Sequence, residues 1–228
     1  MVFAGMVKSS MVDYPGLIAC TLFVPGCNYD CFYCHNRSLI YGTHEEMSGG
    51  YIDEFLKKRA GRLDAVVFSG GEPTLQPGLA DYIGKIKRLG YKTKLDTNGS
   101  LPQAVAGLLD KGLCDYYAVD YKAPASRYGE ICGRGADPSK TLETINLLLK
   151  SGAAFEVRTT VIPQLGLYDL TAMAKELPVL PRFVLNPYRP PEIYLPGDEE
   201  RIKIRPYTKK EIAALADKIR IWQPNVTG

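Results

Sequence analysis

The chain has 228 residues, of which 46% are hydrophobic and 23% are charged, and its formal net charge at pH 7 is +3. These values are typical of a globular protein, and we expect residues 1–228 to form a single domain. The small charge does not indicate nucleic-acid binding, no apolar run approaches the ~18 residues that span a bilayer, and the N-terminus lacks the apolar core of a signal peptide. We therefore expect a cytoplasmic protein that binds neither nucleic acid nor a membrane.

Short apolar runs alternate with helical patterns along the chain. The first apolar run, Leu17–Val24, has the composition of a strand buried on both faces, and Pro25-Gly26 ends it. A helix is expected over about Gly49–Arg59, with Ser48 as its N-cap. The same pattern predicts later strands at 64–69, 91–95, 116–121, 155–162 and 181–186, and later helices at 77–89, 102–111, 139–151, 168–177 and, after Thr208, up to about 220.

Six strands that alternate with helices predict βαβ units, a parallel sheet and an α/β fold. The pattern fits a doubly wound sheet and a barrel equally well, and both architectures place their sites at the C-terminal ends of strands. The longest irregular segment is Tyr188–Pro206. Within it, Arg201–Arg205 alternates basic and apolar residues, which predicts an edge strand.

Three cysteines lie close together after the first predicted strand. Cys27, Cys31 and Cys34 have the spacing C-x3-C-x2-C, which lets one short loop present three thiolates to a metal centre. A [4Fe–4S] cluster has four irons and usually four cysteine ligands, so three cysteines leave one iron open. The alternative is a structural zinc site whose fourth ligand is Cys20 or His35. The close spacing of the triplet indicates metal ligation in a reducing compartment. The other three cysteines are expected to be small buried side chains: Cys20, Cys114 and Cys132.

Polar motifs follow the second and third predicted strands. Gly70-Gly71-Glu72-Pro73 offers two glycines whose backbone lets a ligand approach closely, and a carboxylate that accepts hydrogen bonds from an ammonium group. Asp96-Thr97-Asn98-Gly99 ends the next strand, and its oxygen atoms suit a hard cation. For each motif taken alone, a simple turn is the alternative.

Basic side chains lie on the later strands. Asp120-Tyr121-Lys122 ends the fourth predicted strand, Arg158 lies within an otherwise apolar fifth strand, and Arg189 follows the sixth. An unpaired buried charge is costly, so Arg158 requires a partner. An ion pair with Asp120 and a contact with a bound carboxylate both remain open.

The cysteine triplet, with Tyr33 before its third cysteine, resembles the signature of the radical S-adenosylmethionine (SAM) superfamily. Gly70–Pro73, one strand later, resembles the motif that binds the SAM amino group in that family. The stretch from Lys8 through Asn36 resembles the activating enzymes of glycyl radical enzymes, and the whole resemblance extends to about Arg189. It implies an incomplete (β/α)6 radical SAM barrel with a parallel sheet, and a [4Fe–4S] cluster whose open iron is chelated by SAM.

The same resemblance implies roles for individual residues. Those implied in cofactor binding are Tyr33, Gly70, Gly71, Glu72, Asp96, Thr97, Lys122, Arg158 and Arg189. In the family, the Asp96-Thr97 pair helps to hold a monovalent cation near SAM, and Lys122 faces the SAM carboxylate or ribose. Arg189 stands where enzymes of the pyruvate formate-lyase type have a histidine near SAM, which puts that contact in question. No side chain is expected to act as an acid, base or nucleophile.

By this resemblance, the reduced cluster donates one electron to SAM and so generates a 5′-deoxyadenosyl radical, which removes a hydrogen atom from a glycine of a partner enzyme. The implied partner is a glycyl radical enzyme, most specifically anaerobic ribonucleoside-triphosphate reductase, and the implied electron donor is of the flavodoxin or ferredoxin type. One alternative is a radical SAM enzyme that acts on a small molecule, as the 7-carboxy-7-deazaguanine synthases do. Others are an activase of a different glycyl radical enzyme and a metal-binding module without catalysis.

Overall fold

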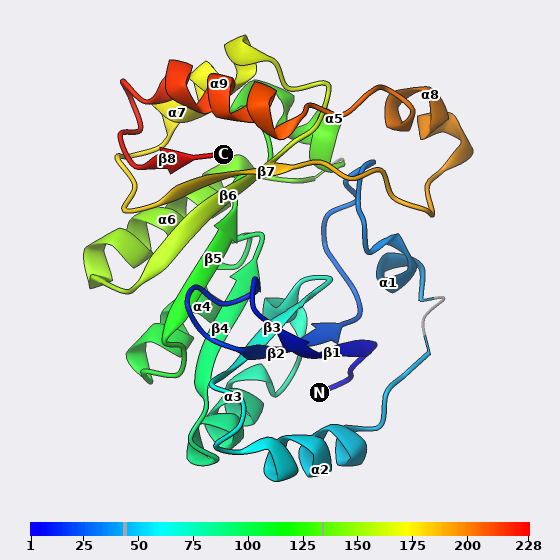
Figure 1. Cartoon of the computed structure of the whole chain (residues 1–228), viewed down its shortest axis with the longest axis vertical. Coiled ribbons are helices and arrows are strands. Elements are labelled where there is room, and N and C mark those ends of the chain that lie inside the picture. Colours follow the sequence, from blue (N-terminus) through cyan, green and yellow to red (C-terminus); the bar gives the residue numbers. More distant parts are fainter. Residues whose placement is uncertain (43–44, 134) are drawn as a thin grey trace. The chain divides into compact units, whose positions relative to one another are not determined.

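The apolar runs of the sequence form the strands of a sheet in the computed structural model, which describes residues 1–42, 45–133 and 135–228 (Figure 1). The strands in these ranges are β1 (Gly5–Ser10), β2 (Ala19–Val24), β3 (Ala65–Gly70), β4 (Lys92–Thr97), β5 (Tyr116–Asp120), β6 (Phe155–Val161), β7 (Phe183–Pro187) and β8 (Val226–Thr227). The α-helices are α1 (Arg37–Tyr41), α2 (Gly49–Arg59), α3 (Leu79–Arg88), α4 (Pro102–Asp110), α5 (Tyr128–Cys132), α6 (Pro138–Ser151), α7 (Leu167–Glu176), α8 (Glu199–Ile202) and α9 (Lys209–Ile219).

The strands follow one another in the sheet in chain order, and β1 and β8 stand at its two ends, so the sheet is open. The pairs β2–β3, β3–β4, β6–β7 and β7–β8 are parallel, whereas β1 runs antiparallel to β2. The six predicted strands correspond to β2 through β7, and helices separate them along the chain. The predicted α/β class with a mainly parallel, unclosed sheet is therefore confirmed.

Contacts within the chain divide it into two compact units. The first unit comprises residues 1–28, 38–97 and 103–118, and the second comprises residues 29–37, 98–102 and 119–228. The prediction of a single domain stays a prediction. No helix in the described ranges is long and apolar enough to cross a membrane.

The first unit is built on β1 to β4, which lie side by side in Figure 1. The residues Ala65–Phe68 of β3 are fully buried, as a central parallel strand requires. The helix α3 buries Leu79, Ile83 and Ile86, which share one helical face. Because β2 and β3 are parallel and in register as far as Val24 and Gly70, both strands end at the same edge of the sheet.

The second unit contains β6, β7 and β8, with α7 and α9 packed against each other and α9 in contact with β7 and β8. The predicted cap of the last helix is confirmed, because Thr208 Oγ1 accepts a hydrogen bond from Glu211 N at 3.2 Å and Glu211 in turn accepts one from Thr208 N at 2.7 Å. The strand β6 carries Arg158 at a partly buried position between buried neighbours.

Three local expectations differ from the structure. The predicted edge strand at Arg201–Arg205 is wrong, because its first two residues end the short helix α8 and the next three form a turn and an irregular segment. An i,i+4 ion pair between Lys203 and Glu199 supports the end of this helix. Ser48 precedes α2, but its side chain makes no capping hydrogen bond. The strand β1 was not predicted, since its exposed and partly buried residues show no apolar alternation.

Candidate functional site

The two glycines of the Gly-Gly-Glu motif lie against the backbone that leads into Cys27. Gly70 has a positive φ of 112°, and a Cβ added there would stand 2.5 Å from the backbone nitrogen of Val24. A Cβ added at Gly71 would stand 1.9 Å from the carbonyl oxygen of Gly26. The backbone N–H of Gly71 donates to Val24 O at 2.8 Å, and that of Glu72 donates to Gly26 O at 2.7 Å. Glycine is therefore required here for backbone packing within the first unit.

Glu72 is fully buried, and its carboxylate joins this motif to the end of β4. Its Oε1 accepts hydrogen bonds from Thr74 N at 3.0 Å, from Thr74 Oγ1 at 2.5 Å and from Thr97 Oγ1 at 2.8 Å. These donors satisfy a buried carboxylate that would otherwise be costly. The structure thus brings together two residues that the sequence predicts for cofactor binding, Glu72 and Thr97.

The Asp-Thr-Asn-Gly motif is divided between the two units, with Asp96 and Thr97 in the first and Asn98 and Gly99 in the second. In the first unit, Lys94 Nζ lies 2.9 Å from Asp96 Oδ1.

In the second unit, two threonine hydroxyls of α6 clamp the turn at Asn98 and Gly99. Thr141 Oγ1 donates to Asn98 O at 2.9 Å, and Thr144 Oγ1 donates to Gly99 O at 2.7 Å. Gly99 has a φ of 72°, and a Cβ added there would meet Val119 at 3.0 Å, so the turn also requires its glycine.

The segment that carries Cys31 and Cys34 is held by a buried arginine. Arg37 is 1% exposed, and it donates to Cys31 O at 2.8 Å and to Asp30 Oδ1 at 2.7 Å. Asp30 N donates to the carbonyl oxygen of Cys132, 2.9 Å away at the end of α5. A hydrogen bond with the Cys132 thiol raises the pKa of Cys31 well above its usual value, and burial raises it further. The Arg37 and Cys132 contacts were not predicted, and they fix the path of this segment.

Tyr33 is buried and packs edge-on against two other rings. Its centroid lies 5.4 Å from that of Phe32 and 6.3 Å from that of Tyr188, which follows β7. The Arg201 guanidinium of α8 lies 3.6 Å from the Phe32 centroid, in a cation–π contact. Arg189, in contrast, is exposed. Tyr188 therefore contacts the cysteine segment through the ring of Tyr33.

Asp120 lies between two cationic side chains in the second unit. Lys122 Nζ is 3.1 Å from Asp120 Oδ2, and Arg158 Nε is 3.0 Å from Asp120 Oδ1. Burial alone would raise the pKa of Asp120, but the charges of Lys122 and Arg158 outweigh burial and lower it to about 2. Of the two partners left open for Arg158, the ion pair with Asp120 is present, and Lys122 belongs to the same group of charges.

The three cysteines are distributed over the two units. Cys27 belongs to the first unit, whereas Cys31 and Cys34 belong to the second. Within the described residues, neither unit alone gathers three His, Cys, Asp or Glu side chains into a metal-binding group. Of the alternative zinc ligands, Cys20 is fully buried in β2, where burial raises its pKa to about 12, and His35 is exposed.

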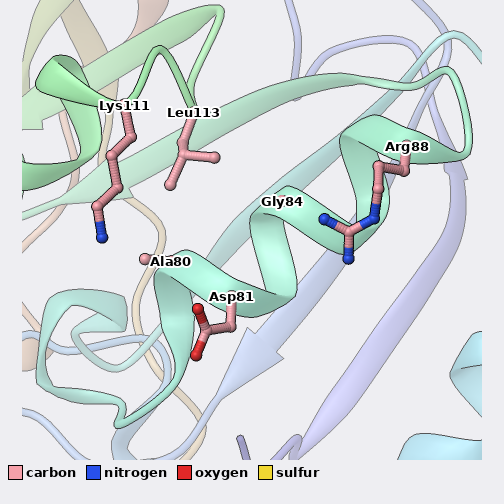
Figure 2. Close-up of a pocket in the computed structure, with 6 residues that line it drawn as sticks. All are labelled: Ala80, Asp81, Gly84, Arg88, Lys111 and Leu113. Atoms are coloured by element: carbon pink, nitrogen blue, oxygen red, sulfur yellow. The ribbon is translucent and has the colours of Figure 1, made fainter.

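Figure 2 shows the residues that line a surface hollow of the first unit. It is lined by α3 and by the segment after α4, through Ala80, Asp81, Gly84, Arg88, Lys111 and Leu113. None of the residues that the sequence predicts for cofactor or metal binding lines it, so we assign it no role.

Comparison with known proteins identifies a family and two relatives. A family model described as the Radical SAM superfamily matches residues 21–177. The chain is 31% identical to a proposed glycyl-radical enzyme activating enzyme of Methanocaldococcus jannaschii, over 98% of this chain and 93% of that protein. It is 24% identical to a 7-carboxy-7-deazaguanine synthase of Thermococcus kodakarensis, over 74% of this chain and 73% of that protein.

Among solved structures, the chain is similar to Streptococcus suis SuiB bound to S-adenosylmethionine, with a TM-score of 0.66 and 16% sequence identity. The match covers 89% of this chain and 48% of that chain, so the chain spans about half the length of SuiB. At this identity the likeness shows the fold alone, and it agrees with the predicted incomplete barrel.

Proposed function

Because the chain belongs to the radical SAM superfamily, we propose that it is an activating enzyme that generates a glycyl radical on a partner enzyme. The observation that carries this proposal is the match to the Methanocaldococcus jannaschii protein over 98% of this chain and 93% of that protein. A match over nearly the whole length of both proteins supports a shared reaction in addition to a shared fold. The proposed partner is anaerobic ribonucleoside-triphosphate reductase.

The residues of the chain fit the two cofactors that the family implies. Cys27, Cys31 and Cys34 would hold a [4Fe–4S] cluster and leave one iron for SAM, since their three sulfurs are fewer than the usual four ligands. When bound, the cluster and SAM would together supply the one-electron chemistry by which a hydrogen atom is removed from the acceptor glycine. A closed structural zinc site would require a fourth protein ligand.

The charges described above complement the SAM molecule. The buried Glu72 carboxylate suits its ammonium group, and the cationic side chains of Lys122 and Arg158 suit its carboxylate. Gly71 keeps the backbone beside Gly26 free of side-chain atoms. The roles of these residues are to bind and orient the cofactor, and none is proposed to act as an acid, base or nucleophile.

We further propose a cytoplasmic location and an electron donor of the flavodoxin or ferredoxin type. Both rest on the glycyl radical reaction itself, which requires a supply of single electrons and a reducing, oxygen-poor compartment.

The test uses anaerobically reconstituted protein with dithionite, SAM and the candidate reductase. We expect 5′-deoxyadenosine and a doublet from a glycyl radical in the electron paramagnetic resonance spectrum. The doublet should disappear when the acceptor glycine of the reductase is replaced by alanine. Cys27→Ala, Cys31→Ala and Cys34→Ala should each abolish both signals and the bound iron, whereas Cys114→Ala, which changes a cysteine outside the triplet, should retain them.

The second candidate is a radical SAM enzyme that acts on a small molecule, and the similarity to the Thermococcus kodakarensis synthase favours it. SAM cleavage without a glycyl radical on any candidate partner, together with turnover of a free pterin, would select this function. Absence of SAM cleavage in protein that carries its full iron content would contradict both candidates.

A further inference from the structure

Lys94 is a buried cation in the first unit that no part of the proposed reaction uses. It lies in β4 and is 1% exposed, although lysine is rarely buried without a partner. Its Nζ stands 2.9 Å from Asp96 Oδ1 and donates to the backbone oxygen of Asp13 at 2.6 Å. The Tyr116 ring lies 6.0 Å from the same ammonium group. Lys94 and Asp96 are two residues apart in the strand, so they share one face of the sheet.

The carbonyl group that Lys94 contacts is held in place by its own surroundings. Asp13 N donates to Ser10 Oγ at 3.3 Å, and Thr21 Oγ1 of β2 donates to Asp13 Oδ2 at 2.7 Å. The ring of Tyr14, next along the chain, packs 5.7 Å from that of Tyr116. The ammonium group is therefore fixed between a positioned carbonyl and the Asp96 carboxylate.

These contacts do not fit an added monovalent cation at Asp96 and Thr97. The negative charge of Asp96 already faces the Lys94 ammonium group at ion-pair distance, 2.9 Å from Asp96 Oδ1. A potassium or sodium ion beside Asp96 would experience the like charge of Lys94 in a buried environment, where repulsion is weakly screened. Sharing one carboxylate between two cations would weaken the binding of both.

We infer that the Lys94 ammonium group serves as a built-in cation at Asp96, in place of a dissociable monovalent ion, so that SAM binding to this protein requires no potassium or sodium. This inference rests on the proposed function, because it concerns the binding of the same cofactor. A covalently attached cation occupies its position at any salt concentration, whereas an ion site fills according to the ion's free concentration.

The experiment compares potassium chloride with choline chloride at equal ionic strength, using anaerobically reconstituted protein. Thermal unfolding and calorimetric SAM binding are measured for the wild type, Lys94→Met and Lys92→Met. Lys92 is the matched control, because it lies in the same strand and also pairs with an aspartate but has a side chain that is 61% exposed. The wild type and Lys92→Met should give the same unfolding temperature and SAM affinity in both salts.

Lys94→Met leaves the buried Asp96 charge without its ammonium partner. We expect its unfolding temperature in choline to fall by on the order of 10 °C, with part of the loss recovered in potassium. The double variant Lys94→Met/Asp96→Asn removes both charges, and its unfolding temperature should not respond to potassium. If Lys94→Met does not fold, Lys94→Gln, which can still donate to Asp13 O, takes its place.

The wild type alone can overturn the inference. A SAM affinity that rises about tenfold or more from choline to potassium would show that an ion site exists beside Lys94. A potassium response in the double variant as large as in Lys94→Met would also contradict it. A wild type that binds SAM equally in both salts but forms no glycyl radical would retain the inference and contradict the proposed function.

Discussion

The two units fix their candidate site residues by different physical means. In the first unit, Gly70 and Gly71 lie so close to the Val24–Gly26 backbone that no side-chain atom fits, and hydrogen bonds of 2.7 and 2.8 Å tie the segments together. In the second unit, ion pairs and aromatic contacts hold the candidate residues in place: Asp120 lies between two cations, and Tyr33 packs against Tyr188. We therefore expect the glycine positions of the first unit to accept no added side-chain atom. The charged positions of the second unit should accept a substitution that changes the shape of the side chain, but not one that changes its charge.

The largest effect should come from Gly71→Ala. The new Cβ would stand 1.9 Å from Gly26 O, so the backbone next to Cys27 must move. We expect a loss of about 3 kcal/mol or more in the free energy of unfolding, and loss of bound iron as well as SAM cleavage. Urea unfolding and iron analysis after reconstitution measure both.

The control for this variant is Gly107→Ala. Gly107 lies within α4 with no atom within 4 Å of an added Cβ, and alanine should leave stability unchanged or raise it by about 0.5–1 kcal/mol. Normal iron content in Gly71→Ala would show that the close packing beside Cys27 is not required.

A smaller loss is expected for Asp120→Asn, which removes the charge between Lys122 and Arg158. Two cations would then face each other without a carboxylate, and the free energy of unfolding should fall by about 2–3 kcal/mol while iron is retained. Asp217→Asn, at an exposed ion pair with Arg220, should change little. Iron loss as complete as in Gly71→Ala would remove the distinction between the two regions.

The pH dependence of stability offers a third comparison. Asp115 of the first unit, like Asp120 of the second, lies between two cations, which here are Lys87 and Lys92. Burial alone would raise the pKa of Asp115, but hydrogen bonds from Lys92, Thr93 N and Lys87 lower it from 3.8 to about 2. Because the folded pKa is the lower one, this stabilisation of about 2 kcal/mol is present above pH 4 and is lost as the pH falls towards 2.

Asp115→Asn should therefore be less stable than the wild type at pH 5, and its stability should decline less between pH 5 and 3. Urea unfolding of the cluster-free protein at several pH values measures the two slopes. Equal slopes would mean that Asp115 does not hold its charge through these contacts.

The smallest effect is expected for Thr97→Val, which keeps the shape of the side chain and removes one of the hydrogen bonds to Glu72. Glu72 retains its two bonds from Thr74, so the loss in the free energy of unfolding should be about 1 kcal/mol. Thr97→Val should also bind SAM more weakly than the wild type, whereas Thr97→Ser, which keeps the hydroxyl, should bind SAM as tightly as the wild type. If both variants bind SAM equally, the hydroxyl does not position Glu72.

Much of the fold could be predicted from the sequence, because its central strands are continuous apolar runs. The strand predicted at Asp64–Ser69 corresponds to β3, and each of its bounds differs by one residue. The helix predicted at Gly49–Arg59 has the bounds of α2. The strand β1 was missed because an edge strand buries too little to leave an apolar pattern. The edge strand predicted at Arg201–Arg205 was wrong, since alternation over five residues cannot be distinguished from the end of a helix and a following turn with exposed charges.

The candidate site was only partly predictable, because motifs mark positions but not partners. Lys92 and Lys94 share a strand face, yet their side chains are 61% and 2% exposed, and only the fold separates them. The two-residue spacing of Lys94 and Asp96 was a usable signal, because it places both side chains on one face of a strand. The Cys31–Cys132 contact joins positions 101 residues apart, which no local pattern reveals.

The clamped turn at Asn98 and Gly99 has a consequence for the chemical ageing of the protein. Asn-Gly is a labile sequence, because the glycine nitrogen can attack the asparagine side chain and convert it to aspartate or isoaspartate. Here both carbonyl groups are held by α6 hydroxyls, and Asn98 Oδ1 accepts a hydrogen bond from Ser100 N at 2.9 Å, which restrains that attack. Deamidation at this turn should therefore occur mainly in unfolded chains and report how often the native packing opens.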